Sequence, residues 1–179
     1  MSQIKEEILN VSKKVEKELK PIFEKVEEIC EINSQKVLDA FQSCNLSEMH
    51  LNTSTGYGIG EPGRDKIEEI YAKIFKAEDA LVRVQFVNGT HAIATTLKGL
   101  LMPGDTLLAV TGRPYDTICE TIGITQNINK LSLVSYGIKY DEIDLNDEGL
   151  IDIPNVKKYI SENKVKVVHI QRSRGYALR

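Results

Sequence analysis

The sequence predicts an α/β fold with a mostly parallel sheet, preceded by a helical segment. From residue 80 onward, short apolar runs rich in β-branched residues alternate with amphipathic stretches, and turns containing Gly or Pro separate them. The first 50 residues lack this alternation, and their seven lysines and ten acidic residues account for the net charge of -3 of the whole chain. We therefore divide the chain into a helical segment, residues 1–50, and an α/β part, residues 51–179.

The helical segment carries an apolar stripe. Ile, Val and Leu19 recur at steps of three and four between Ile4 and Ile29, with Lys and Glu between them. Pro21 interrupts the stripe, which predicts two helices or one kinked helix. A second short helix is expected over residues 35–42. The stripe fits core packing within the chain, and it fits equally an arm that clasps another subunit.

A glycine-rich loop separates this segment from the α/β elements. Residues 52–64 hold four glycines and a proline, which indicates a loop. Asp65, with Glu68 three residues later, indicates the N-cap of a helix. The remaining pattern predicts strands over 80–87, 106–110, 131–135 and 165–170, helices over 90–101, 115–122 and 153–163, and a polar connector over 144–152.

Composition and charge exclude several classes of protein. A chain that is 41% hydrophobic and 27% charged is globular, and a net charge of -3 argues against a nucleic-acid binder. No stretch approaches the ~20 apolar residues of a membrane span, and the N-terminus lacks the basic start of a signal peptide. Three scattered cysteines without metal-ligand spacing predict reduced thiols, a cytoplasmic location and no metal site.

The most informative junction follows the first predicted strand. Gly89, Thr90 and His91 open a helix there, and free amides at a helix N-terminus favour an anion such as phosphate. A tight strand-to-helix connection without any ligand accounts for the same residues.

Two further groups follow later strands. Arg113 can meet an anion and Tyr115 can stack on a flat ligand, although a plain surface loop fits both. Arg172 and Arg174 can bind a carboxylate or phosphate, or form a solvated basic turn. Loops that follow parallel strands line one crevice, so the shared placement of the three groups predicts an anion-binding crevice.

Several motifs, in the same order along the chain, resemble a known family. They are Ser54-Thr55-Gly56-Tyr57-Gly58, Gly63-Arg64-Asp65, Gly89-Thr90-His91-Ala92-Ile93-Ala94, Pro103-Gly104-Asp105 and Gly112-Arg113-Pro114-Tyr115-Asp116-Thr117. The chain resembles the pyridoxal-phosphate enzymes of the methionine γ-lyase and cystathionine lyase type, in the branch named for aluminium resistance. The resemblance implies part of the large domain of a fold-type-I enzyme, with pyridoxal 5'-phosphate as cofactor.

The resemblance also implies roles for individual residues. The amides of Gly89, Thr90 and His91 would hold the cofactor phosphate, and Tyr115 would stack on the pyridine ring. Tyr57 matches a tyrosine that relatives donate to the phosphate site of a neighbouring subunit, which implies a homo-oligomer, a dimer of dimers. Relatives carry a phosphate-binding arginine two residues after that tyrosine, whereas this chain has Ile59 there and Arg64 nearby.

The catalytic residues are expected outside this chain. In the family the lysine that forms the Schiff base comes later, so we expect it beyond Arg179 and expect the 179-residue chain alone to be inactive. Arg113, Arg172 and Arg174 are the candidates for binding the amino-acid substrate. The implied activity is a carbon–sulfur lyase; an aminotransferase or other enzyme of the same fold, and a non-catalytic assembly module, are the alternatives.

Overall fold

The computed structural model describes residues 4–172, which belong to two compact units. The first, here called the N-terminal unit, ends at Val84, and the second, the sheet unit, begins at Gln85. Each unit has its own buried apolar residues. Among residues 4–172, no helix combines the length and apolar character that crossing a bilayer requires.

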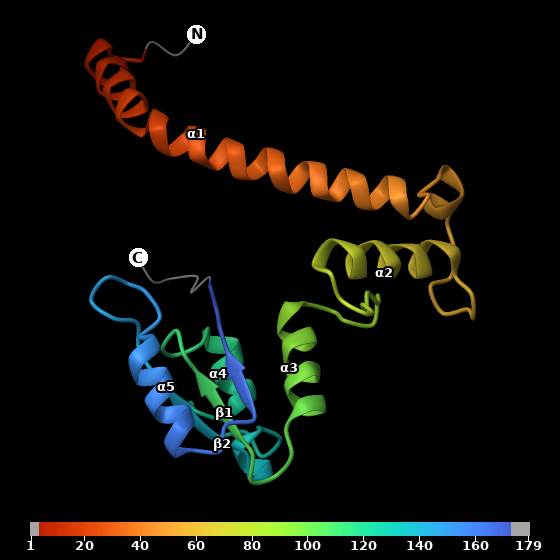
Figure 1. Cartoon of the computed structure of the whole chain (residues 1–179), viewed down its shortest axis with the longest axis vertical. Helices are drawn as coiled ribbons and strands as arrows, with labels where there is room; N and C mark the ends of the chain where they lie inside the picture. Colours follow the sequence, from red (N-terminus) through yellow and green to blue (C-terminus); the bar gives the residue numbers. More distant parts are fainter. Residues whose placement is uncertain (1–3, 173–179) are drawn as a thin grey trace. The chain divides into compact units, whose positions relative to one another are not determined.

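The N-terminal unit consists of α1 (Glu6–Ser43), the 3-10 turn η1 (Glu48–Leu51) and α2 (Pro62–Phe75). The helix α1 is continuous over 38 residues, with Pro21 inside it, and it is bent in its N-terminal half (Figure 1). The prediction of a separate helix over 35–42 is wrong. No Gly or Pro lies between Ile22 and Ser43 to end the helix, so these residues simply continue α1.

The end of α1 packs against α2. Ala40 and Cys44 are buried with Ile70 of α2, and the Lys66 ammonium donates to the Cys44 carbonyl at 2.6 Å. The prediction of Asp65 as an N-cap is wrong, because α2 begins three residues earlier at Pro62. Proline suits the first helical turn, where its missing N–H has no intrahelical partner to lose.

The prediction of a strand over residues 80–87 is wrong. These residues form no strand in the described part of the chain, and Leu81, Val84 and Val87 are exposed. The Val82 amide donates to Glu68 Oε1 at 2.8 Å, and Arg83 forms an ion pair with the same carboxylate. A side chain of α2 therefore takes the bond that a neighbouring strand would have needed.

The sheet unit is an α/β layer structure. Its elements are α3 (Gly89–Leu100), β1 (Thr106–Ala109), α4 (Asp116–Ile122), η2 (Val134–Tyr136), β2 (Lys139–Glu142), α5 (Ile153–Glu162) and β3 (Val167–His169). The strands form a parallel sheet in the order β2-β1-β3. The predicted α/β class and parallel sheet are confirmed, as are the helices α3, α4 and α5.

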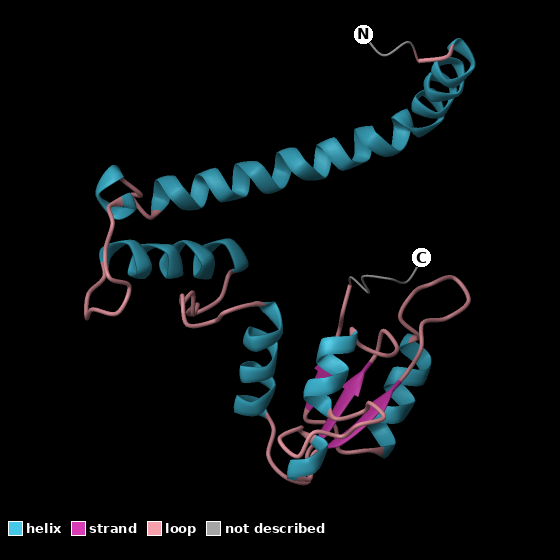
Figure 2. Ribbon diagram, turned by 180° about the vertical axis from the view of Figure 1, so that it is seen from behind, coloured by secondary structure: helices cyan, strands magenta, loops and turns pink. Residues whose placement is uncertain are grey.

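The central strand β1 is buried on both faces. Leu107 packs with residues of α3 and α4, including Leu97 and Ile118. Leu108 faces the opposite way and packs with Val156 of α5. Because side chains alternate along a strand, α3 and α4 cover one face and α5 covers the other, as Figure 2 shows for α4 and α5.

One strand lies elsewhere than predicted. Residues 131–133 form a turn that leads into η2, so the prediction of a strand over 131–135 is wrong, and β2 follows instead at Lys139–Glu142. Ser132 is buried and its hydroxyl bonds to that of Ser135 at 2.9 Å, which closes the turn.

Candidate cofactor-phosphate site

The first component of the site is the N-terminus of α3. Asn88 is the N-cap, and its side-chain oxygen accepts from the His91 amide at 2.8 Å. The amides of Gly89 and Thr90 precede it in the first turn, where no carbonyl of the helix can reach them. A Cβ placed on Gly89 would meet nothing within 4 Å, so the chain is not crowded at the side-chain position of Gly89. The N-terminus thus offers two donors and the positive end of the helix dipole to an anion.

His91 takes part in a different way from Gly89 and Thr90. Its amide is occupied by Asn88, and its ring nitrogen Nδ1 accepts from the Val87 amide at 3.4 Å. The imidazole also meets the Phe86 ring edge-on, with ring centroids 5.7 Å apart. These contacts fix the turn that leads into α3.

A hydroxyl pair connects α3 to α4. Thr90 Oγ1 and Thr117 Oγ1 are 2.9 Å apart, and Thr117 lies in the first turn of α4, two residues after its N-cap Tyr115. The structure therefore joins the N-terminus of α3 to the turn that carries Tyr115. A polar pocket of about 470 Å³ also lies between these helices, with both threonines and His91 among its lining residues.

The topology supplies an independent reason to expect a ligand here. The chain passes from β1 to β2 on one side and then crosses to β3 on the other, so its direction of winding reverses at β1. In open parallel sheets, ligands bind at such switch points, beyond the carboxyl ends of the strands. The residues that follow β1 and β3 flank this position, and they include Tyr115.

Gln171 joins the two flanking segments, and sequence reasoning gave it no role. Its amide donates to Thr111 Oγ1 at 3.1 Å, and its side-chain oxygen accepts from the Tyr115 amide at 3.0 Å. The half-buried Tyr115 is thus held in place from β3. Its position directly after an apolar strand was a signal in the sequence.

The predicted arginines have different surroundings. Arg113 is exposed, and its guanidinium donates to the Ile124 carbonyl just past the end of α4. Arg172 is exposed after β3, whereas Arg174 lies outside the described residues. Binding of the substrate by these three arginines stays a prediction.

Burial shifts the pKa of two titratable groups in the sheet unit. His169 lies in β3 and is half-buried, and burial lowers its pKa. The Cys119 thiol donates to the Pro114 carbonyl at 3.2 Å, and burial raises its pKa, with nearby Arg113 acting in the opposite direction. Both groups are therefore neutral at pH 7. Within residues 4–172, no cluster of His, Cys, Asp and Glu is arranged to hold a metal ion.

Tyr57 lies in the N-terminal unit and is 75% exposed. Arg64 does not face solvent as a free cation: it donates to the Gly58 carbonyl at 3.0 Å and pairs with Asp65 at 3.2 Å. In the structure Arg64 therefore braces the loop that contains Tyr57.

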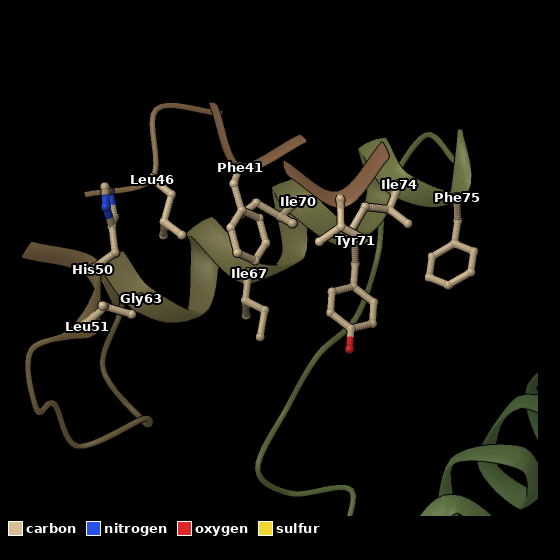
Figure 3. A pocket seen from close by; sticks show the side chains of 11 residues that line it. Phe41, Leu46, His50, Leu51, Gly63, Ile67, Ile70, Tyr71, Ile74 and Phe75 are labelled. Atoms are coloured by element: carbon tan, nitrogen blue, oxygen red, sulfur yellow. The ribbon is translucent and has the colours of Figure 1, made fainter. Parts of the chain in front are cut away.

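The same unit exposes much apolar surface. A pocket of about 630 Å³ lies between the end of α1, η1 and α2, and Figure 3 shows Phe41, Ile67, Ile70 and Tyr71 around it. The Ile and Val residues of the α1 stripe, among them Ile8, are also exposed, whereas Leu19 is half-buried. Apolar surface of this extent is typical of protein contacts.

The fold and site define an α/β domain that places a helix N-terminus and an aromatic beside the switch point of a parallel sheet. The chain belongs to the methionine gamma-lyase family, whose model matches residues 8–179. It is similar to a solved carbon-sulfur lyase involved in aluminum resistance from Clostridium novyi NT, with 43% identity, a TM-score of 0.87 and 95% of this chain covered. A Listeria innocua structure, provisionally named as a cystathionine beta-lyase involved in aluminum resistance, is 49% identical over 98% of this chain, with a TM-score of 0.84.

A curated relative agrees with these structures. The protein YnbB of Bacillus subtilis strain 168, which is uncharacterized, is 45% identical over 165 residues, or 92% of this chain. The chain spans 39% of YnbB, 41% of the Clostridium protein and 42% of the Listeria protein. It therefore corresponds to about two fifths of its relatives, and its fold matches their N-terminal part.

Proposed function

We propose that this chain forms the phosphate-binding part of a pyridoxal-phosphate-dependent carbon–sulfur lyase that acts on sulfur-containing amino acids. The observation that carries the proposal is the bond between Thr90 and Thr117. It joins the first turn of α3, which contains the Gly89 and Thr90 amides, to the turn that bears Tyr115. A phosphorylated pyridine needs both an anion site and an aromatic face, and membership of the family supports this choice of ligand.

The residues of this chain would bind and orient the cofactor. The Gly89 and Thr90 amides would hold the phosphate and Tyr115 would stack on the ring, while Gln171 accepts a hydrogen bond from the Tyr115 amide. Tyr57 would contact the phosphate bound to a neighbouring subunit. When bound, the cofactor withdraws electrons from the α-carbon of the amino acid, which allows a sulfur substituent to leave.

Product analysis of the full-length protein tests the reaction. With cystathionine or methionine as substrate, a lyase releases a thiol, ammonia and a keto acid. A keto acid formed without thiol or ammonia would support an aminotransferase instead. Thr90→Val and Thr117→Val should weaken cofactor binding, whereas Thr96→Val, in α3 with a hydroxyl that donates to the Ala92 carbonyl, is the matched control.

The exposed apolar surfaces support a proposal about assembly. We infer that the α1 stripe and the pocket beside α2 are covered by other subunits of a homo-oligomer. The same surfaces favour the alternative of an assembly module without catalysis. Light scattering should give an oligomer for the full-length protein at micromolar concentration; a monomer would contradict the inference. An oligomer that binds no cofactor and turns over no substrate would support the assembly module.

A further inference from the structure

Glu61 is a buried carboxylate at the base of the loop that carries Tyr57. Its residue is only 6% exposed, and it is the N-cap of α2. One oxygen, Oε1, accepts from Thr55 Oγ1 at 2.7 Å and from the Gly58 amide at 3.0 Å. A buried charge is costly unless such donors compensate it. One carboxylate oxygen therefore binds both Thr55 and Gly58, which lie on either side of Tyr57 in the loop.

The backbone beside Tyr57 is held from two directions. Glu61 binds the Gly58 amide, and the Arg64 guanidinium binds the Gly58 carbonyl at 3.0 Å. On the other side, the Tyr57 amide donates to Thr55 Oγ1 at 3.3 Å. A Cβ on Gly58 would lie 2.8 Å from Glu61 Oε1, so a larger residue there would force the Glu61 side chain to shift. The main chain is braced while the phenol ring remains exposed.

Such bracing matters for a side chain that must meet a ligand. A loop that is already ordered loses less conformational freedom on binding, so more of the contact energy appears as affinity. We propose that Glu61 is a positioning residue that holds the loop 55–61 in one conformation, so that Tyr57 meets the cofactor phosphate of a neighbouring subunit. The role of Tyr57 in this statement rests on the proposed function. The bracing of the loop rests on the contacts of Glu61 alone.

Hydrogen exchange at the Gly58 amide tests the bracing directly. In the full-length protein, Glu61→Ala should speed this exchange by about 10- to 100-fold, as expected for a lost hydrogen bond to a charged group. Glu61→Gln keeps an accepting oxygen and should have a smaller effect, which also guards against a variant that fails to fold. Glu78→Ala, at an exposed carboxylate of the same unit, is the control. Unchanged Gly58 exchange in Glu61→Ala would overturn the proposal.

Cofactor binding tests the positioning role. Glu61→Ala should weaken binding of pyridoxal 5'-phosphate about as much as Tyr57→Phe does, and should leave binding of pyridoxal, which has no phosphate, unchanged. In the Tyr57→Phe background, Glu61→Ala should add nothing, because the two residues act through one contact. Additive effects, or equal losses for both forms of the cofactor, would overturn the positioning role.

The outcomes separate this inference from the proposed function. If Tyr57→Phe weakens phosphate-dependent binding and Glu61→Ala does not, only the role of Glu61 is wrong. If Tyr57→Phe binds both cofactor forms like the parent, the proposed role of Tyr57 fails and the positioning role fails with it. The Gly58 exchange then still decides whether Glu61 holds the loop.

Discussion

Gly123→Ala should strongly destabilise the sheet unit. Gly123 ends α4 with a φ of +94°, a conformation that costs an alanine about 1–2 kcal/mol. Its new Cβ would lie 2.7 Å from the Cβ of the buried Ser132 and would also overlap the Ser132 hydroxyl. Overpacking of this kind costs about 1–3 kcal/mol. The expected total is about 2–5 kcal/mol, taken from the addition of these two costs.

Two other glycines separate the backbone cost from the steric one. Gly104 has a φ of +93° with nothing within 4 Å of its Cβ position, so Gly104→Ala should cost only the backbone share of about 1–2 kcal/mol. Gly99 lies inside α3 with open space around it and no positive φ. Gly99→Ala should therefore stabilise the unit by about 0.5–1 kcal/mol.

The cysteines provide the assay. Cys119 is 4% exposed in the sheet unit and Cys44 is 2% exposed in the N-terminal unit, whereas Cys30 is exposed. Labelling of each thiol under native conditions, read by mass spectrometry, reports opening of its own unit. In Gly123→Ala, Cys119 should be labelled at least about 30-fold faster than in the parent, because each 1.4 kcal/mol of lost stability corresponds to about a tenfold change in the open population. The labelling rate of Cys44 should stay unchanged. A rate for Gly123→Ala equal to that of Gly104→Ala would refute the steric argument.

Three further predictions concern Lys66, Glu61 and Tyr115. Lys66→Met removes the ammonium that donates to the Cys44 carbonyl. The N-terminal unit should lose about 1.5–3 kcal/mol of stability, so the Cys44 thiol should be labelled faster. An unchanged labelling rate would contradict the importance of this contact. Hydrogen bonds from Ser54, Thr55 and Gly58 lower the pKa of Glu61 from 4.5 to about 2. The ionised carboxylate therefore stabilises the loop fully above pH 4.5, and this stabilisation is lost as the pH falls toward 2. Loss of protection of the Gly58 amide between pH 7 and 5 would contradict this pH dependence. Tyr115→Ala in the full-length protein should weaken cofactor binding about three- to tenfold and Tyr115→Phe should not, because the ring provides the stacking; equal affinity in Tyr115→Ala would show that Tyr115 is only a loop residue.

The elements predicted best are those with apolar periodicity and a clear boundary. β1 is a run of buried residues between a Pro-Gly turn and a glycine, and α3, α4 and α5 have amphipathic spacing with polar N-caps or a glycine after them. Here the local pattern and the final burial agree, so sequence alone identifies the element.

The errors arise where tertiary partners decide. Residues 80–87 have the composition of a strand, but a strand needs a neighbour, and Glu68 binds their backbone instead. β2 is an edge strand, Lys139–Glu142, whose charged and polar residues give no apolar run. No local pattern distinguishes these two cases, because the deciding bonds come from residues far along the chain.

The site shows the same division. Gly89 and Thr90 are predicted from the sequence because a glycine between an apolar run and a helix has a known use, and their role stays a prediction. Asn88 and Gln171 were missed as participants, since their contribution consists of hydrogen bonds to the His91 and Tyr115 amides. Glu61 was missed for the same reason: its donors become visible only once the loop is closed.

A crystal structure of the full-length protein with pyridoxal 5'-phosphate tests the central claim most directly. The account predicts phosphate oxygens within hydrogen-bonding distance of the Gly89 and Thr90 amides, with the ring of Tyr115 over the pyridine. A phosphate bound elsewhere, for example between Arg113 and Arg172 with the start of α3 left to water, would contradict the claim.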